Sequence, residues 1–124
     1  MKKFIYIFVC GFLGAFTRSC IYKIDFLNLS FPYSTVIVNL LGAFLLSCLT
    51  FLALKDIKLN KELHLGLTTG FLGAFTTFST LSKDVFMMIE NGNLIPAMTY
   101  ISISLIGGYL CVYLGYVLVN MKWR

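Results

Sequence analysis

The strongest constraint on this chain is a succession of four apolar segments, each long enough to cross a lipid bilayer. They cover residues 4–22, 31–54, 63–90 and 94–121 of a chain of 124 residues. A transmembrane helix needs about 20 apolar residues, and a soluble domain this short could not bury so much apolar surface inside itself. We therefore expect an all-α membrane protein, with residues 1–124 forming a single unit of four transmembrane helices. Such a multi-pass protein belongs in the cell membrane.

Positive charge gathers at the two ends of the chain and in the connection between the second and third segments. The net charge is +5, and seven of the ten Lys and Arg residues belong to the side of the membrane that holds the N-terminus: Lys2, Lys3, Lys55, Lys58, Lys61, Lys122 and Arg124. The other side has Arg18, Lys23 and Lys83. Because cytoplasmic loops carry the excess of Lys and Arg, we expect both termini in the cytoplasm. These residues form no basic face of the kind that binds nucleic acid, so we exclude nucleic acid as a partner.

The third apolar segment, residues 63–90, differs from the other three. It contains three glycines and a hydroxyl-rich patch, and Lys83 and Asp84 arrive before its apolar character ends. A continuous helix would place these charges at an unfavourable depth in the membrane. Non-helical backbone is tolerated there where it is buried in protein or lines a cavity. The segment therefore predicts a helix that is broken near its middle, between residues 73 and 79.

One heptapeptide occurs twice without change. The sequence GFLGAFT covers residues 11–17 in the first segment and residues 70–76 in the third. Both helices could need small residues for close approach of their backbones. An ancient duplication of two helices is the alternative, since the first and third helices run in the same direction. We favour close packing, because Thr35 and Asn39 have no counterparts at the same offset.

Polar side chains form narrow stripes within three of the segments. Thr35 and Asn39 are four residues apart in the second segment, as are Tyr100 and Ser104 in the fourth. In the third segment Phe78 is surrounded by hydroxyl groups, those of Thr76, Thr77, Ser79, Thr80 and Ser82. Nearly all of these groups can donate a hydrogen bond and none is negatively charged, which suits a path that conducts an anion without holding it tightly. The positive edge of the Phe78 ring could also face an anion.

These polar residues also have purely structural explanations. A Ser or Thr hydroxyl in a helix often bonds to the carbonyl one turn earlier, whereas Asn39, with two donors at mid-span, favours a functional role. Arg18 could extend to the membrane interface or attract anions to a pore entrance, and the two roles are compatible. The sequence has no Ser-His-Asp set, no phosphate-binding loop and no His/Cys metal cluster. We therefore expect no enzymatic activity.

At this point the sequence resembles a known family. Residues 70–80, GFLGAFTTFST, are closely similar to the third-helix signature of the Fluc (CrcB-type) fluoride channels. Residues 11–18, residues 39–44 and the pair Tyr100 and Ser104 agree with that family in order and spacing. The resemblance covers the whole chain. It implies a fluoride-selective channel that lets fluoride leave the cell passively and so reduces fluoride toxicity in the cytoplasm.

The resemblance also implies an assembly and a set of site residues. Fluc channels are antiparallel dimers of four-helix subunits, with two fluoride pathways along the subunit interface. The residues implied to line the pathway here are Thr35, Asn39, Phe78, Thr80, Tyr100 and Ser104. The break in the third helix would hold a structural sodium ion that is not transported. Its ligands would be the backbone carbonyls of Gly73 and Thr76 from both subunits.

Two features depart from that pattern. The family commonly has a second phenylalanine three residues after Phe78, where this chain has Leu81. Leucine has no ring edge, so one step of the aromatic track is missing or is supplied otherwise. The charge bias of seven against three also favours one orientation in the membrane. The partner is therefore either an identical subunit or an oppositely oriented homologue.

Two other functions stay open from the residues alone. A small proton-coupled multidrug exporter also has four short helices, but it needs an acidic residue within the membrane. The first segment has none, and Asp84 and Glu90 lie late in the third. A structural membrane subunit without transport would explain the small-residue packing, but it would not explain the stripes of hydrogen-bond donors.

Overall fold

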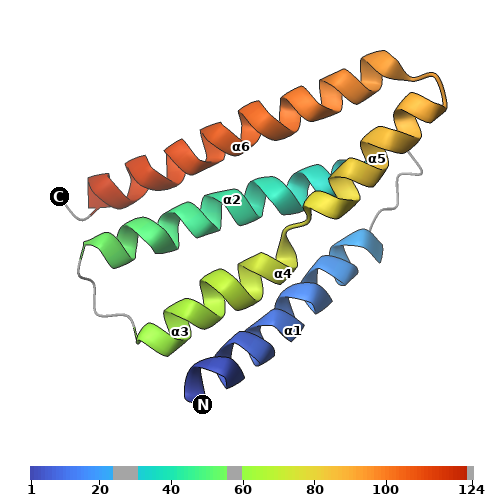
Figure 1. The fold of residues 1–124 in the computed structure, drawn as a ribbon. Coiled ribbons are helices and arrows are strands. Elements are labelled where there is room, and N and C mark those ends of the chain that lie inside the picture. The colour runs from blue at the N-terminus through green and yellow to red at the C-terminus, as the bar shows by residue number, and fades with distance from the viewer. Residues whose placement is uncertain (24–30, 56–59, 123–124) are drawn as a thin grey trace.

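The computed structural model describes residues 1–23, 31–55 and 60–122, and every regular element in these parts of the chain is a helix (Figure 1). Lys58 and Arg124, which the charge count included, lie outside the described residues. Three helices are uninterrupted: α1 (Lys2–Lys23), α2 (Tyr33–Leu54) and α6 (Leu94–Lys122). All three are long and apolar enough to cross a membrane. The prediction of a multi-pass, all-helical membrane protein is confirmed.

The third segment is divided into pieces. It consists of α3 (Lys61–Leu65), the π-helical η1 (Gly66–Leu72), α4 (Gly73–Phe75) and α5 (Phe78–Glu90). Between α4 and α5 the backbone is extended, with ψ 157° at Thr76 and φ −149°, ψ 115° at Thr77. The predicted break is therefore confirmed and falls at these two residues. The π-helical turns before it were not predicted.

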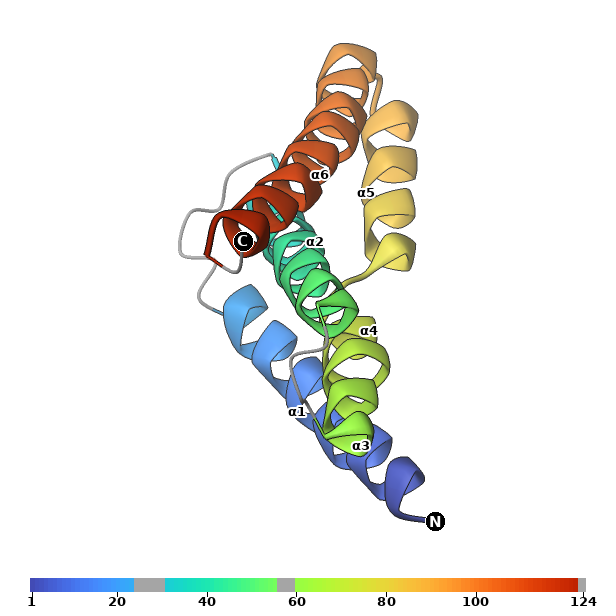
Figure 2. The same cartoon turned by 90° about the vertical axis from the view of Figure 1, so that its left-hand side faces the viewer.

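The break lets the third segment change neighbours. Its first half, α3 to α4, packs against α1, whereas α5 packs against α6. Helix α2 lies between α6 on one side and the α1–α3 pair on the other (Figures 1 and 2). The polar residues that come after the break therefore lie on a helix that packs against α6, whereas the residues before it pack against α1.

Glycines hold α1 close to η1. A Cβ atom on Gly14 would collide with the backbone oxygen of Phe71, and one on Gly70 would lie 2.6 Å from the carbonyl oxygen of Ile7. Any larger side chain would force the two helices apart. This contact supports the close-packing explanation for the repeated heptapeptide.

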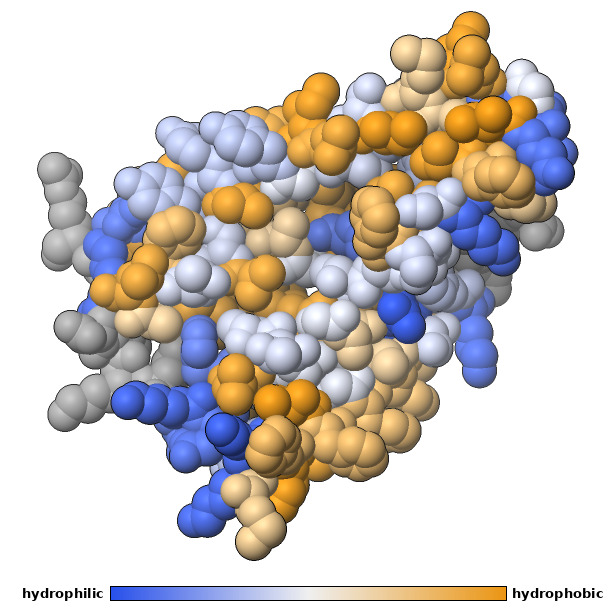
Figure 3. Space-filling model, in the orientation of Figure 1, coloured by the Kyte–Doolittle hydropathy of each residue, from blue (hydrophilic) through white to orange (hydrophobic). Residues whose placement is uncertain are grey.

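Much of the surface of the described residues is apolar. Large side chains such as Phe8 (77% exposed) and Ile106 (62% exposed) point outward, and hydrophilic residues lie mainly towards the ends of the helices (Figure 3). The buried side chains form two small clusters, one around the fully buried Tyr100 and one around Val38. Lipid or a partner subunit must therefore cover much of this surface, as expected for a protein within a bilayer.

Candidate functional site

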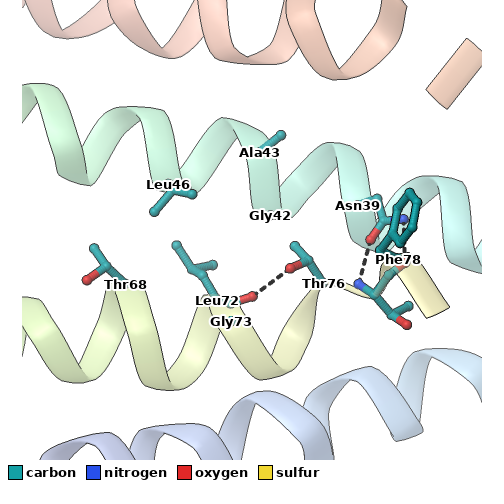
Figure 4. A pocket seen from close by; sticks show the side chains of 10 residues that line it. Asn39, Gly42, Ala43, Leu46, Thr68, Leu72, Gly73, Thr76 and Phe78 are labelled. Carbon is teal, nitrogen blue, oxygen red and sulfur yellow. Dashed lines mark hydrogen bonds between the residues drawn. The ribbon is translucent and has the colours of Figure 1, made fainter. Parts of the chain in front are cut away.

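The centre of the candidate site is the contact between Asn39 of α2 and the extended residue Thr77 (Figure 4). The Asn39 amide nitrogen donates to the carbonyl oxygen of Thr77 at 3.0 Å, and the Thr77 N–H donates to Asn39 Oδ1 at 2.8 Å. Thr77 is only 6% exposed. Unpaired backbone groups are costly inside a membrane, so the Asn39 side chain supplies the two partners that the broken helix does not.

Thr77 also begins the next helix. Its hydroxyl oxygen accepts a hydrogen bond from the backbone N–H of Thr80 at 3.2 Å, which is the N-cap contact typical of threonine. The same oxygen lies 3.0 Å from the Thr80 hydroxyl and 3.2 Å from the Ser79 hydroxyl. The predicted pathway residue Thr80 is thus tied to Thr77, which was not among the predicted pathway residues. The signal for Thr77 in the sequence was a threonine at the predicted end of the break, where the next helix needs an N-cap residue.

Two cavities share Asn39 and Phe78 as lining residues. The first, of about 360 Å³, is lined by Asn39, Gly42, Ala43, Leu46, Thr68, Leu72, Gly73, Thr76, Thr77 and Phe78 (Figure 4). The second, of about 480 Å³, is lined by Asn39, Phe78, Leu81, Ser82, Val85, Ile101, Ser104 and Leu105. Phe78 is 80% exposed at the start of α5. The structure therefore places Asn39 and Phe78 at both cavities, and it places Ser104 at the second, which lies between α2, α5 and α6.

Two predicted pathway residues converge on a carboxylate. The Thr35 hydroxyl and the Tyr100 hydroxyl both donate to Oδ2 of Asp84, each at 3.1 Å. Tyr22 of α1 extends this group, with its hydroxyl 3.3 Å from that of Thr35. Asp84 was not a predicted site residue, because the prediction considered uncharged donors. An acidic residue within an apolar segment was the available signal.

Several hydroxyls of the predicted stripes bond to their own helix. Ser104 donates to the carbonyl of Tyr100 at 2.8 Å, and Thr76 donates to that of Leu72 at 2.9 Å. Ser82 does the same with Phe78 at 3.0 Å. The structural explanation therefore holds for these three hydroxyls, and each would have to turn to face an ion.

Two further predicted features lie at the margins of the site. Arg18 is half-buried in the last two turns of α1, and both of its suggested roles stay predictions. Leu81 lines the second cavity and packs against the cluster around Tyr100. Its neighbours there are largely apolar, which fits leucine.

Comparison with known proteins decides the family. Residues 5–116 match the family model described as CrcB-like protein, camphor resistance (CrcB). The chain belongs to the CrcB-like family. All the candidate site residues, from Arg18 to Ser104, lie within the matched range.

Individual relatives of this CrcB-like chain carry the name of a channel. It is 37% identical, over 100% of its length and 98% of the relative, to the fluoride-specific ion channel FluC of Chlorobaculum tepidum. It is 41% identical to FluC 1 of Bacillus cereus (95% of this chain, 89% of the relative). FluC 1 of Desulfitobacterium hafniense is also 41% identical (83% of this chain, 90% of the relative). None of these three names is that of an enzyme, an exporter of drugs or a structural subunit.

Proposed function

We propose that this chain is a subunit of a fluoride-specific ion channel that lets fluoride leave the cell passively and lowers its concentration in the cytoplasm. The observation that carries the proposal is the 37–41% identity to fluoride channels over most of both chains. The cavities around Asn39 and Phe78 give that function a place in the structure.

In the proposed path, fluoride exchanges part of its hydration shell for protein donors. The Asn39 amide nitrogen carries two hydrogens, of which one is given to Thr77. The second can be offered to an ion in either adjoining cavity. The positive edge of the Phe78 ring supplies a further contact without a full charge, so the ion is held weakly enough to leave.

The hydroxyl groups act in the proposed path by exchanging acceptors. Thr35 and Tyr100 donate to Asp84, and Ser104 donates to the carbonyl of Tyr100. A fluoride ion that reaches them replaces these oxygens as the acceptor. Hydrogen bonds to a charged group such as the Asp84 carboxylate contribute about 1.5–3 kcal/mol net, whereas a bond to a carbonyl contributes about 0.5–1.5 kcal/mol. The exchange is therefore easier at Ser104 than at Thr35 or Tyr100. The negative charge of Asp84 would oppose an ion held directly beside it.

The subunit is proposed to pair with a second, oppositely oriented subunit, identical or homologous. The exposed ring of Phe78 and the polar groups of Asn39 and Thr76 lie at a cavity on the surface of one subunit. Covering this cavity with another subunit removes polar backbone from contact with lipid, which is the stable solution in a bilayer.

A structural sodium ion fits the oxygen atoms at the break. The oxygen donors at this break are backbone carbonyls and the hydroxyls of Thr76 and Thr77. Gly73 and Thr76, the two predicted ligands, both line the first cavity at the break. Carbonyls of an unwound helix suit sodium chemically. When bound, the ion would supply positive charge that holds the helix pieces of two subunits together.

The test is fluoride efflux from liposomes that contain the purified protein. We expect rapid efflux of fluoride but not of chloride from the wild-type protein, and a loss of at least about tenfold with Asn39→Ala. A matched control is Ser102→Ala, because Ser102 is exposed and bonds only to its own helix at Met98. Absence of fluoride efflux from correctly inserted wild-type protein would contradict the proposed function.

A further inference from the structure

We propose that Asn39 and Thr77 are positioning residues whose side chains keep the carbonyls of Gly73 and Thr76 available to a cation. They do so by occupying the two backbone N–H groups that would otherwise bond to those carbonyls. The inference rests on the sodium site proposed above, and it assigns that site two residues that are not ligands.

The first carbonyl is that of Gly73. In an uninterrupted α-helix each N–H donates to the carbonyl four residues earlier, so the donor for Gly73 would be the N–H of Thr77. That N–H instead donates to Asn39 Oδ1 at 2.8 Å. The amide of Asn39 also binds the Thr77 carbonyl, which fixes Thr77 through both of its backbone groups.

The second carbonyl is that of Thr76. Its donor in an uninterrupted helix would be the N–H of Thr80. That N–H instead donates to the hydroxyl oxygen of Thr77 at 3.2 Å. The N–H of Thr76 itself still donates to the carbonyl of Leu72 at 3.0 Å. The helical pattern therefore persists up to the Thr76 N–H and is diverted immediately beyond it.

The two carbonyls that lose their helical N–H donors are the two predicted sodium ligands. Gly73, Thr76, Asn39 and Thr77 all line one cavity (Figure 4), and Thr77 is 6% exposed. Without these side-chain acceptors, the N–H groups of Thr77 and Thr80 could return to the carbonyls and compete with the ion. One competing hydrogen bond of typical net strength corresponds to a loss of up to about tenfold in ion affinity.

The experiment measures stabilisation by sodium, which is independent of fluoride transport. The melting temperature of the purified channel is recorded as sodium replaces choline at constant ionic strength. Thr77→Val keeps the shape and β-branching but lacks the accepting hydroxyl. We expect it to raise the sodium concentration for half-maximal stabilisation by about tenfold. Thr77→Ser, which keeps the acceptor, should respond like the wild type.

Thr99→Val is the matched control, because Thr99 is an exposed threonine that bonds only within α6, at Ile95. If Thr77→Val fails to fold, Asn39→Leu tests the Gly73 carbonyl in the same way, and it should weaken the sodium response. An unchanged sodium response in Thr77→Val or, where that variant cannot be purified, in Asn39→Leu overturns this inference and leaves the proposed sodium site standing. A wild-type protein that sodium does not stabilise overturns the sodium site and this inference together. Fluoride efflux would then still test the proposed channel function.

Discussion

The same seven residues, GFLGAFT, lead to two different structures in this chain. In α1, residues 11–17 lie inside a helix that continues to Lys23. In the third segment, residues 70–76 end at an extended break. Their local contacts are nevertheless alike. Thr17 donates to the carbonyl four residues earlier at 2.8 Å, and Thr76 does the same at 2.9 Å.

The phenylalanines of the two copies also behave alike. Phe12 and Phe16 stack with ring centroids 6.4 Å apart, and Phe71 and Phe75 stack at 5.7 Å. The heptapeptide therefore makes the same side-chain contacts in both places, although residues 70–72 belong to the π-helical η1. The cause of the break must lie in the next residues of the chain and in the side chains that face them.

The residue after each copy and its neighbour across the bundle account for the difference. Arg18 continues the helix of α1, whereas Thr77 gives its N–H to Asn39 and caps α5 with its hydroxyl. The comparison teaches that the break is a tertiary feature. A side chain from α2 replaces the missing helical partners, so the local sequence needs only to permit the break.

The largest effect should come from forcing the two copies apart. Gly14→Ala places a Cβ atom against the backbone oxygen of Phe71, and overpacking of this kind costs about 1–3 kcal/mol or more. We expect a strongly reduced yield of folded protein and a lower melting temperature, measured by gel filtration and thermal denaturation. Gly11→Ala is the control, because its Cβ would lie 3.7 Å from Gly70, an ordinary contact. Equal stability of the two variants would contradict the close contact.

The second effect should come from removing the side chain that distinguishes the second copy. Asn39→Leu removes both hydrogen bonds to Thr77, and unpaired buried groups cost about 1–3 kcal/mol. We expect a lower melting temperature and loss of fluoride efflux. Asn120→Leu, a half-buried asparagine near the end of α6, should be much milder. If both variants are equally stable, the break does not depend on Asn39.

The third effect concerns the helix that begins after the break. Leu81→Phe would place a second ring beside the second cavity, which Leu81 lines. The edge of an aromatic ring is positive and can face an anion, so we expect fluoride efflux to rise if rings guide the ion. Leu105→Phe, at the exposed side of the same cavity, is the control for added bulk. Unchanged or slower efflux in Leu81→Phe would count against the use of rings.

The smallest effect should come from giving the first copy the residue that comes after the second. Arg18→Thr extends the identity of the two copies to eight residues, GFLGAFTT. We expect α1 to stay unbroken, because Asn39, the side chain that partners the break, is already bonded to Thr77. Circular dichroism and the melting temperature check this. A loss of helix in Arg18→Thr would mean that the local sequence alone creates the break.

Composition and hydropathy were sufficient to predict the helices and the range of the break. The break was predictable because Gly73 and the charged Lys83 lie within the third apolar segment, where they conflict with a continuous transmembrane helix. The polar residues Asn39, Thr35 and Tyr100 were identifiable for the same reason, since such groups are costly in lipid. Their partners were not identifiable. The contact between Asn39 and Thr77 joins residues 38 apart in the sequence, and it depends on how α2 and the third segment pack.

Other features had weaker signals. Asp84 stands within an apolar segment, but a prediction based on neutral donors excluded it, although it accepts from Thr35 and Tyr100. The π-helical turns of η1 had no local pattern beyond glycine spacing, because they arise where the backbone of α1 approaches Gly66 and Gly70.

The π-helical stretch has a consequence for the angle at which the break faces the bundle. Each residue of an α-helix advances the chain by about 100° around its axis, and π-helical turns hold more residues than α-helical ones because their hydrogen bonds span five residues. Gly66–Leu72 thereby acts as an angular spacer ahead of the break. Winding the same seven residues as an α-helix would turn the chain further and rotate Thr77 away from Asn39. The π-helical winding therefore sets the rotation of the break as well as its reach.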